Sequence, residues 1–264
     1  MSITPPALLP GLAAAPAAPV SAAGAVQAFR RSTREGEETR ALERLAREPS
    51  ITRAMEQFRR AVERAPDAAA ALRDPRVREV VLTALGLPDA LDQGGLAARA
   101  LLADPKSPES LLARLSDRRW RAAAEALNLH DRGIAALRDP EVQARLADGL
   151  RRARWREELE AEAPGLGDAI LFRERAARAR SAYEVLGDPV LRRVVTTALG
   201  LPVQIAVQSV EAQARAVTAR LDIARLQDPK EVARLAERYL LARSSEAHPA
   251  SAGLPGLAPL RRLV

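Results

Sequence analysis

The sequence predicts an all-α protein: an elongated multi-helix body built from a duplicated helical unit, with disordered N- and C-terminal tails. The 264 residues are 47% hydrophobic but only 3% aromatic, and a core of Leu, Ala and Val suits closely packed helices. No β-branched run bounded by turn residues predicts a strand. Residues 71–88 and 185–202 are identical at twelve of eighteen positions without a gap. The copies lie 114 residues apart, which indicates a repeated subdomain rather than the short period of a solenoid.

Each copy of the repeat begins with the signals that start a helix. Asp74 and Asp188 are placed at an N-cap, where a carboxylate accepts hydrogen bonds from free backbone N–H groups of the first turn. Pro75 and Pro189 follow at the first helical position, where the missing N–H is harmless. We therefore expect a helix to start at each Asp-Pro pair.

Each copy then carries one apolar stripe and a stop signal. Apolar residues recur at i, i+3, i+4, i+7 and i+8, and they are Val77, Val80, Val81, Ala84 and Leu85 in the first copy and Leu191, Val194, Val195, Ala198 and Leu199 in the second. A glycine placed for the left-handed conformation follows, and a proline two residues later prevents continuation. We interpret six residues as structural caps of two three-turn core helices: Asp74, Pro75, Gly86, Asp188, Pro189 and Gly200.

Prolines divide the rest of the chain into further helices. We expect a first helical half over residues 24–130, connector helices over 131–182, and a second, shorter half over 183–243. Asp139-Pro140 repeats the start signal and opens the long helix that joins the halves. Neither half is rich in large apolar residues, so we expect the two to share one core, with two separate domains as the alternative.

Both ends of the chain are predicted to be disordered. Residues 1–23 form an uncharged, Pro/Ala-rich arm, and the tail, residues 244–264, is similar in its Pro, Ala and Ser content. No Lys or Arg precedes the apolar part of the arm, and prolines at positions 5, 6, 10, 16 and 19 break the helix that a secretory signal or a membrane span requires. We therefore expect a mobile arm and no membrane span.

The chain is basic, with a formal net charge of +7. All basic residues except Lys106 and Lys230 are arginine, as is typical of a GC-rich genome, so the charge alone is poor evidence for an acidic partner. Two clusters, 118–121 and 151–156, embed a tryptophan among arginines. Helical spacing predicts that the tryptophan turns inward and the arginines outward, beside carboxylates that offset much of the charge. The candidate partner surface consists of Arg118, Arg119, Arg151 and Arg154, and the sequence disfavours nucleic acid as that partner.

The residue types that support catalysis or metal binding are scarce. The chain has no cysteine, which excludes disulfides, thiolate catalysis and thiolate metal sites. His130 and His248 have no ligand-like neighbour at helical spacing, and no glycine-rich phosphate loop is present. We assign no catalytic, cofactor-binding or metal-binding residue, and we expect a protein that is not an enzyme and needs no cofactor.

Three segments carry a resemblance to a known family. Residues 71–88 read ALRDPRVREVVLTALGLP, residues 111–120 read LLARLSDRRW, and residues 184–202 read EVLGDPVLRRVVTTALGLP. In these segments the chain resembles the domain of unknown function 1217 family, over about residues 24–243. It departs from that family at its N-terminus, where Pro/Ala repeats replace a Ser-Gly and aromatic-rich opening. The resemblance implies an alphaproteobacterial source and a link to flagella, because genes of the family often lie among flagellar genes, and it implies no assigned activity.

Three functional hypotheses follow. The first is a non-enzymatic, flagellum-associated structural or exported protein that acts through protein–protein contacts and is cytoplasmic before export. An uncharged N-terminus, few aromatic residues and no cysteine agree with export. The second is a cytoplasmic adaptor or chaperone-like partner of a flagellar component, which an exposed apolar stripe on a helix such as 204–225 would favour. The third is an arginine-rich nucleic-acid-binding protein.

Overall fold

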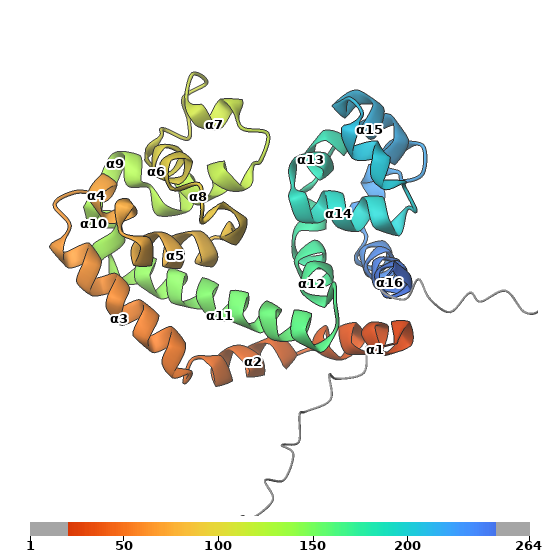
Figure 1. Ribbon diagram of the computed structural model, residues 1–264, viewed down its shortest axis with the longest axis horizontal. Helices are drawn as coiled ribbons and strands as arrows, with labels where there is room; N and C mark the ends of the chain where they lie inside the picture. The colour runs from red at the N-terminus through yellow and green to blue at the C-terminus, as the bar shows by residue number, and fades with distance from the viewer. Residues whose placement is uncertain (1–20, 247–264) are drawn as a thin grey trace, which may run out of the picture.

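The all-α class is confirmed. The computed structural model describes residues 21–246, and within that range every regular element is an α-helix or a 3-10 helix (Figure 1). The elements are α1 Ala22–Ser32, α2 Glu37–Leu45, α3 Pro49–Arg64, α4 Ala68–Arg73, α5 Pro75–Ala84, η1 Pro88–Ala90, α6 Gly94–Leu102, α7 Leu111–Arg114, α8 Arg119–Leu127, α9 Leu129–Arg132, α10 Ile134–Arg138, α11 Pro140–Glu162, α12 Leu166–Arg175, η2 Ala176–Arg178, α13 Ala182–Gly187, α14 Pro189–Ala198, η3 Val203–Val207, α15 Val210–Thr218, η4 Ile223–Gln227 and α16 Pro229–Glu246. None of the helices in this range is both long and apolar enough to cross a membrane.

The predicted disordered tails lie mostly outside the described residues. Positions 1–20 of the arm and 247–264 of the tail are not described. The inner ends of both predictions are wrong, because residues 22 and 23 open α1 and residues 244–246 close α16. Ser21 starts α1, since its hydroxyl accepts from the backbone N–H of Gly24 at 3.1 Å. Ser244 stays helical and donates from its hydroxyl to the carbonyl of Leu240 at 2.9 Å.

The buried hydrophobic residues form two clusters rather than the one shared core that we expected. The first cluster runs from Met55 to Leu146, in α3 to α10 and the first half of α11. The second is built by α12 to α16 together with α1, the end of α2 and the end of α11. We call these two parts the first and second lobes, and Figure 1 shows them as the two arms of a V. Alanine supplies many members of both clusters, so close helix packing fills each core without many large side chains.

The N-terminal helix α1 lies in the second lobe, which differs from the predicted grouping of residues 24–130. Ala25, Ala28 and Phe29 are at most 3% exposed and belong to the second cluster. Arg30 pairs with Glu237 of α16 through two hydrogen bonds of 2.8 and 3.0 Å. The predicted connector, 131–182, is likewise divided, because α10 contributes to the first cluster and α12 to the second. Both differences arise from long-range packing, which the local sequence pattern does not report.

The two copies of the repeat form the same local structure. The six predicted caps stand at the ends of α5 and α14: Asp74, Pro75, Gly86, Asp188, Pro189 and Gly200. Asp74 accepts from the backbone N–H of residue 76 at 2.8 Å, and Asp188 accepts from that of residue 190 at the same distance. The two glycines have φ values of +75° and +61°. Each copy therefore presents its apolar stripe to the core of its own lobe.

The long helix α11 joins the lobes. Asp139 caps it by accepting from the backbone N–H of residue 141 at 2.8 Å. Leu146 belongs to the first cluster, whereas Trp155 and Leu159 belong to the second. Both tryptophans of the chain turn inward as predicted, since Trp155 and Trp120 are each 5% exposed.

Residues 204–225 do not form one helix. They are divided among η3, α15 and the start of η4. Side-chain caps start two of the pieces: Ser209 caps α15 by accepting from the N–H of Ala212 at 3.3 Å, and Asp222 caps η4 by accepting from that of Ala224 at 3.0 Å. This segment is thus a series of short turns on the second lobe.

Candidate functional site

Arg119 is turned into the structure and does not belong to an open partner surface. Its side chain is 11% exposed. It donates to the carboxylates of Asp89 and Asp117 and to the carbonyl of Gly86, at 2.7 to 3.1 Å. Burial acts to lower the pKa of Arg119, but the hydrogen bonds to Asp89 and Asp117 outweigh it and raise that pKa above its usual value. Arg119 therefore clamps the end of the first repeat copy.

The other three candidate residues lie at the surface in ion pairs. Arg118 pairs with Glu184 of the second lobe at 2.9 Å, and its side chain is 73% exposed. Arg151 pairs with Asp148, and Arg154 lies near Glu48 and Glu157. Surface ion pairs of this kind contribute little to stability. Arg118 lies between the lobes, whereas the other two lie on α11. The structure does not gather the four arginines into one concavity.

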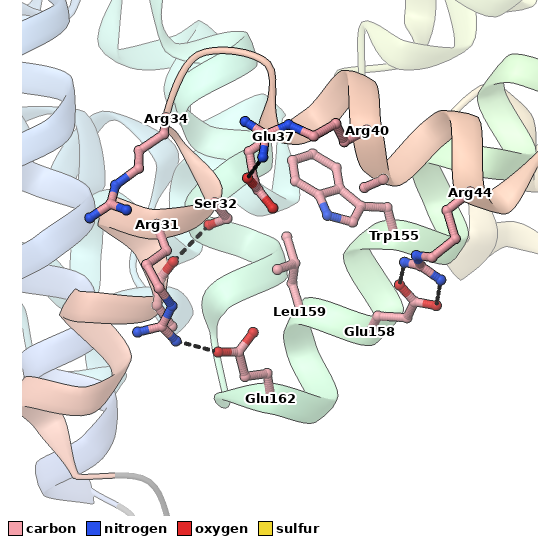
Figure 2. A pocket seen from close by; sticks show the side chains of 12 residues that line it. Arg31, Ser32, Arg34, Glu37, Arg40, Arg44, Trp155, Glu158, Leu159 and Glu162 are labelled. Carbon is pink, nitrogen blue, oxygen red and sulfur yellow. Dashed lines mark hydrogen bonds and ion pairs between the residues drawn. The ribbon is translucent and has the colours of Figure 1, made fainter.

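A charged pocket lies where α1 and α2 cross the end of α11 (Figure 2). Trp155 and Leu159 form its apolar part, and its volume is about 460 Å³. Most of its arginines are occupied: Arg44 makes two hydrogen bonds to Glu158, Arg31 pairs with Glu162 at 2.6 Å, and Arg40 lies 3.4 Å from Glu37. This pocket is held by its own ion pairs, which fasten α1 and α2 to α11.

A groove with a volume of about 740 Å³ lies between the lobes. Its first-lobe wall is formed by α7 and the residues that follow it, including Leu112 and Leu115. Its second-lobe wall is formed by α13 and the start of α15, including Tyr183, Leu186 and Val210. We call this the inter-lobe groove. Its rim carries three arginines and one carboxylate: Arg118, Arg121, Arg192 and Glu184.

The lobes touch within this groove. A Cβ atom on Gly187 would lie 2.7 Å from the carbonyl oxygen of Ser116, so any side chain at position 187 would push α13 away from the first lobe. The ion pair between Arg118 and Glu184 bridges the same contact. The width of the groove therefore depends on a backbone approach that only glycine allows.

The groove exposes large apolar side chains on its second-lobe wall. Among residues 21–246, no group of His, Cys, Asp and Glu side chains is arranged to hold a metal ion. Tyr183 and Val210 are 55% and 50% exposed, which is unusual for large apolar side chains on a wall that faces other apolar side chains. Of the predicted residues only Arg118 lines this groove. Tyr183 and Val210 were missed because nothing in their local pattern distinguishes them from residues that are packed in a core.

Comparison with protein families places the groove within a known sequence unit. A family model described as "Protein of unknown function (DUF1217)" matches residues 91–232, more than half of the chain. The chain belongs to this family. The DUF1217 match includes both walls of the inter-lobe groove, from Leu112 to Val210.

A solved structure shares the fold. The crystal structure of protein AGR_C_984 from Agrobacterium tumefaciens, a structural genomics target, aligns with a TM-score of 0.70 and 22% sequence identity. The alignment covers 92% of this chain and 99% of that one. The comparison with curated proteins gives no match. The two-lobed helical arrangement is thus similar to that of an alphaproteobacterial protein at low sequence identity.

Proposed function

We propose that this DUF1217 protein is a non-enzymatic, flagellum-associated protein that acts through protein–protein contacts at the inter-lobe groove. The observation that carries the proposal is the exposure of Tyr183 and Val210 on a wall that faces Leu112 and Leu115. Apolar side chains left in water gain free energy when a partner covers them. The flagellar link comes from the family resemblance, whose genes often lie among flagellar genes.

The partner element that best fits the groove is an amphipathic helix with acidic residues along its edges. Such a helix places apolar side chains at i, i+3, i+4 and i+7 into a groove. Arg121 donates to the carbonyl of Pro105, and neither Arg121 nor Arg192 pairs with a carboxylate of a described residue, so the rim is complementary to carboxylates. We expect the apolar contacts to supply most of the affinity and the arginines to orient the helix.

The proposal is tested in a flagellated host that lacks its own copy of the gene. We expect Tyr183→Asp combined with Val210→Asp to abolish rescue of swimming, because the new charges would have to be buried beneath the partner. Leu241→Asp is the matched control, since Leu241 is 46% exposed but does not line the groove. Immunoblots must show equal protein levels. Normal swimming with the double variant would contradict the proposal.

The second candidate function is a cytoplasmic adaptor, and one observation favours it. Val207 is 89% exposed within residues 204–225, where an apolar stripe was expected of an adaptor, and Val203, which precedes that segment, is 83% exposed. Immunoblots of culture supernatant and cell fractions separate the two candidates, when a parent strain is compared with one that lacks a working flagellar export gate. Protein found in the medium only with a working gate supports export. Protein retained in the cells of both strains supports the adaptor.

A further inference from the structure

A second pocket between the lobes is lined by arginines from three consecutive elements. It has a volume of about 270 Å³ and lies between the end of α5, α8, α11 and α12. Arg152 and Arg156 enter from α11, Arg175 from α12 and Arg178 from η2, and Glu174 is the single carboxylate in its lining. We call this the seam pocket. Its volume is at the small end for ligand sites, which limits it to a small ligand.

Two of these arginines already have acidic partners outside the pocket. Arg175 pairs with Asp188 at 3.2 Å, and Arg152 lies 3.7 Å from Glu38. The guanidinium groups of Arg156 and Arg178 make no hydrogen bond or ion pair with another described residue. The seam pocket therefore contains guanidinium charge that no ion pair neutralises. This charge lies mainly on Arg156, because Arg178 is open to solvent.

The environment of Arg156 is unfavourable to its charge. Burial lowers the pKa of Arg156, and the neighbouring Arg175 and Arg152 lower it further, against the opposing effect of Glu174 and Glu38. The C-terminus of α5 brings a partial negative charge toward the pocket, yet no carbonyl of α5 accepts a hydrogen bond from Arg156. A half-buried guanidinium without a partner lowers the stability of a fold unless an anion reaches it.

We propose that the seam pocket binds a small phosphate-type dianion, with Arg156 as its central ligand and Arg152, Arg175 and Arg178 around it. A guanidinium group donates two parallel hydrogen bonds to phosphate oxygens. The arginines come from three elements, α11, α12 and η2, so they approach a ligand from more than one direction. The tetrahedral oxygens of phosphate accept from such directions, whereas the two oxygens of a carboxylate lie in one plane. This site lies outside the inter-lobe groove and does not depend on the proposed function.

The test uses the full chain and measures its thermal unfolding midpoint. Inorganic phosphate is compared with chloride at equal ionic strength, which separates binding from screening. We expect phosphate to raise the midpoint by about 2 °C or more. Glycerol phosphate is the second probe: a response to inorganic phosphate alone identifies the free ion, and a response to both identifies a terminal phosphate of a small molecule.

Arg156→Met provides the decisive variant. It keeps an unbranched apolar side chain but removes the charge, so we expect a higher midpoint than the parent without phosphate and at least ~10-fold weaker phosphate binding by calorimetry. Arg154→Met is the matched control, because Arg154 is exposed on the same helix and does not line the pocket. The proposal would be overturned if phosphate raised the midpoints of the parent and of Arg156→Met equally, or if it did not raise the midpoint of the parent. A lower midpoint of Arg156→Met without phosphate would also overturn it, since Arg156 would then be compensated within the fold.

Discussion

Gly86 is the place where arginines from both lobes meet. Its carbonyl accepts from Arg119 at 2.8 Å, and a Cβ atom built on it would lie 2.6 Å from Nη2 of Arg175. Arg175 in turn pairs with Asp188, the cap of the second repeat copy. The guanidinium group of Arg175 thus lies against the end of one copy while it pairs with the start of the other. Gly200, the corresponding residue of the second copy, has nothing within 4 Å of its Cβ position.

This difference predicts unequal costs for the same substitution. Gly200→Ala is expected to lower the free energy of unfolding by about 1 kcal/mol, because only the left-handed backbone resists the side chain. Gly86→Ala is expected to cost up to about 1 kcal/mol more than Gly200→Ala, because the flexible end of Arg175 must also move and its ion pair with Asp188 is disturbed. Urea titrations of the two variants measure the difference. Equal losses would show that the contact with Arg175 has no energetic weight.

The ion pair between Arg119 and Asp89 makes the stability of the protein depend on pH. The hydrogen bond from Arg119 lowers the pKa of Asp89 below its usual value of 3.8, against the opposing effect of burial. A carboxyl group whose pKa is lowered by folding contributes stability that is fully present above pH 3.8 and is lost as the pH falls through the lowered value. The contribution is below about 1 kcal/mol, because the Asp89 side chain is 56% exposed.

We therefore expect Asp89→Asn to be less stable than the parent at neutral pH and equally stable near pH 2. Denaturant titrations at a series of pH values check this convergence. Asp92→Asn is a suitable control, since Asp92 is exposed and makes no ion pair with another described residue. If Asp89→Asn remains less stable than the parent by the same amount down to pH 2, the loss of stability comes from packing and not from the ion pair with Arg119.

The crossing of α5 and α11 depends on a glycine inside a helix. A Cβ atom on Gly149 would overlap the backbone carbonyl of Ala84. Glycine is unfavourable within a helix, and here it allows two backbones to approach as side chains would not. This crossing attaches the helix of the first repeat copy to the helix that joins both lobes.

Gly149→Ala is expected to destabilise the protein by about 1–3 kcal/mol, because backbone cannot move aside as a flexible side chain does. Gly95→Ala in α6 is the matched control, since its Cβ position has nothing within 4 Å. The control should be neutral or stabilising by up to about 1 kcal/mol, through the better helix propensity of alanine. Thermal and urea unfolding of both variants provide the test. An unchanged free energy of unfolding for Gly149→Ala would mean that α5 and α11 can move apart without loss of stability.

The two lobes have separate cores but share one helix. Trp120 lies in the first cluster and Trp155 in the second, and the chain has no other tryptophan. Because α11 places residues in both clusters over 23 residues, unfolding of one lobe removes part of the core of the other. Two cores joined in this way are expected to unfold together.

Single-tryptophan variants test this coupling directly. Trp155→Phe leaves Trp120 as the fluorescent probe of the first lobe, and Trp120→Phe leaves Trp155 as the probe of the second. In each variant, we expect the fluorescence midpoint in urea to coincide with the midpoint of helix loss by circular dichroism. A fluorescence change that clearly precedes the loss of helix in either variant would show that its lobe unfolds separately.

Several elements were predictable because their causes are local. An Asp-Pro pair starts a helix through hydrogen bonds to its own first turn, and a glycine ends one by its own backbone conformation, so α5, α14 and the start of α11 follow from the sequence. The inward turn of Trp120 and Trp155 follows from helical spacing. The division at residue 24 was wrong because α1 starts at a serine cap that an apolar, proline-rich arm hides, and its packing on α16 depends on residues more than 200 positions away.

The candidate site was much less predictable. Arg118 and Arg119 are neighbours with the same side chain, yet one lies on the rim of a groove and the other is buried against Asp89 and Asp117. Tyr183 and Val210 form a wall only because Gly187 lets α13 approach Ser116. By itself the sequence determined the helical class, the capped repeat and the absence of cysteine chemistry, since composition and hydrogen bonds within a turn decide these. Only the tertiary structure decided the two cores, the groove and which arginines lack a partner, because these depend on contacts between residues that are distant in the chain.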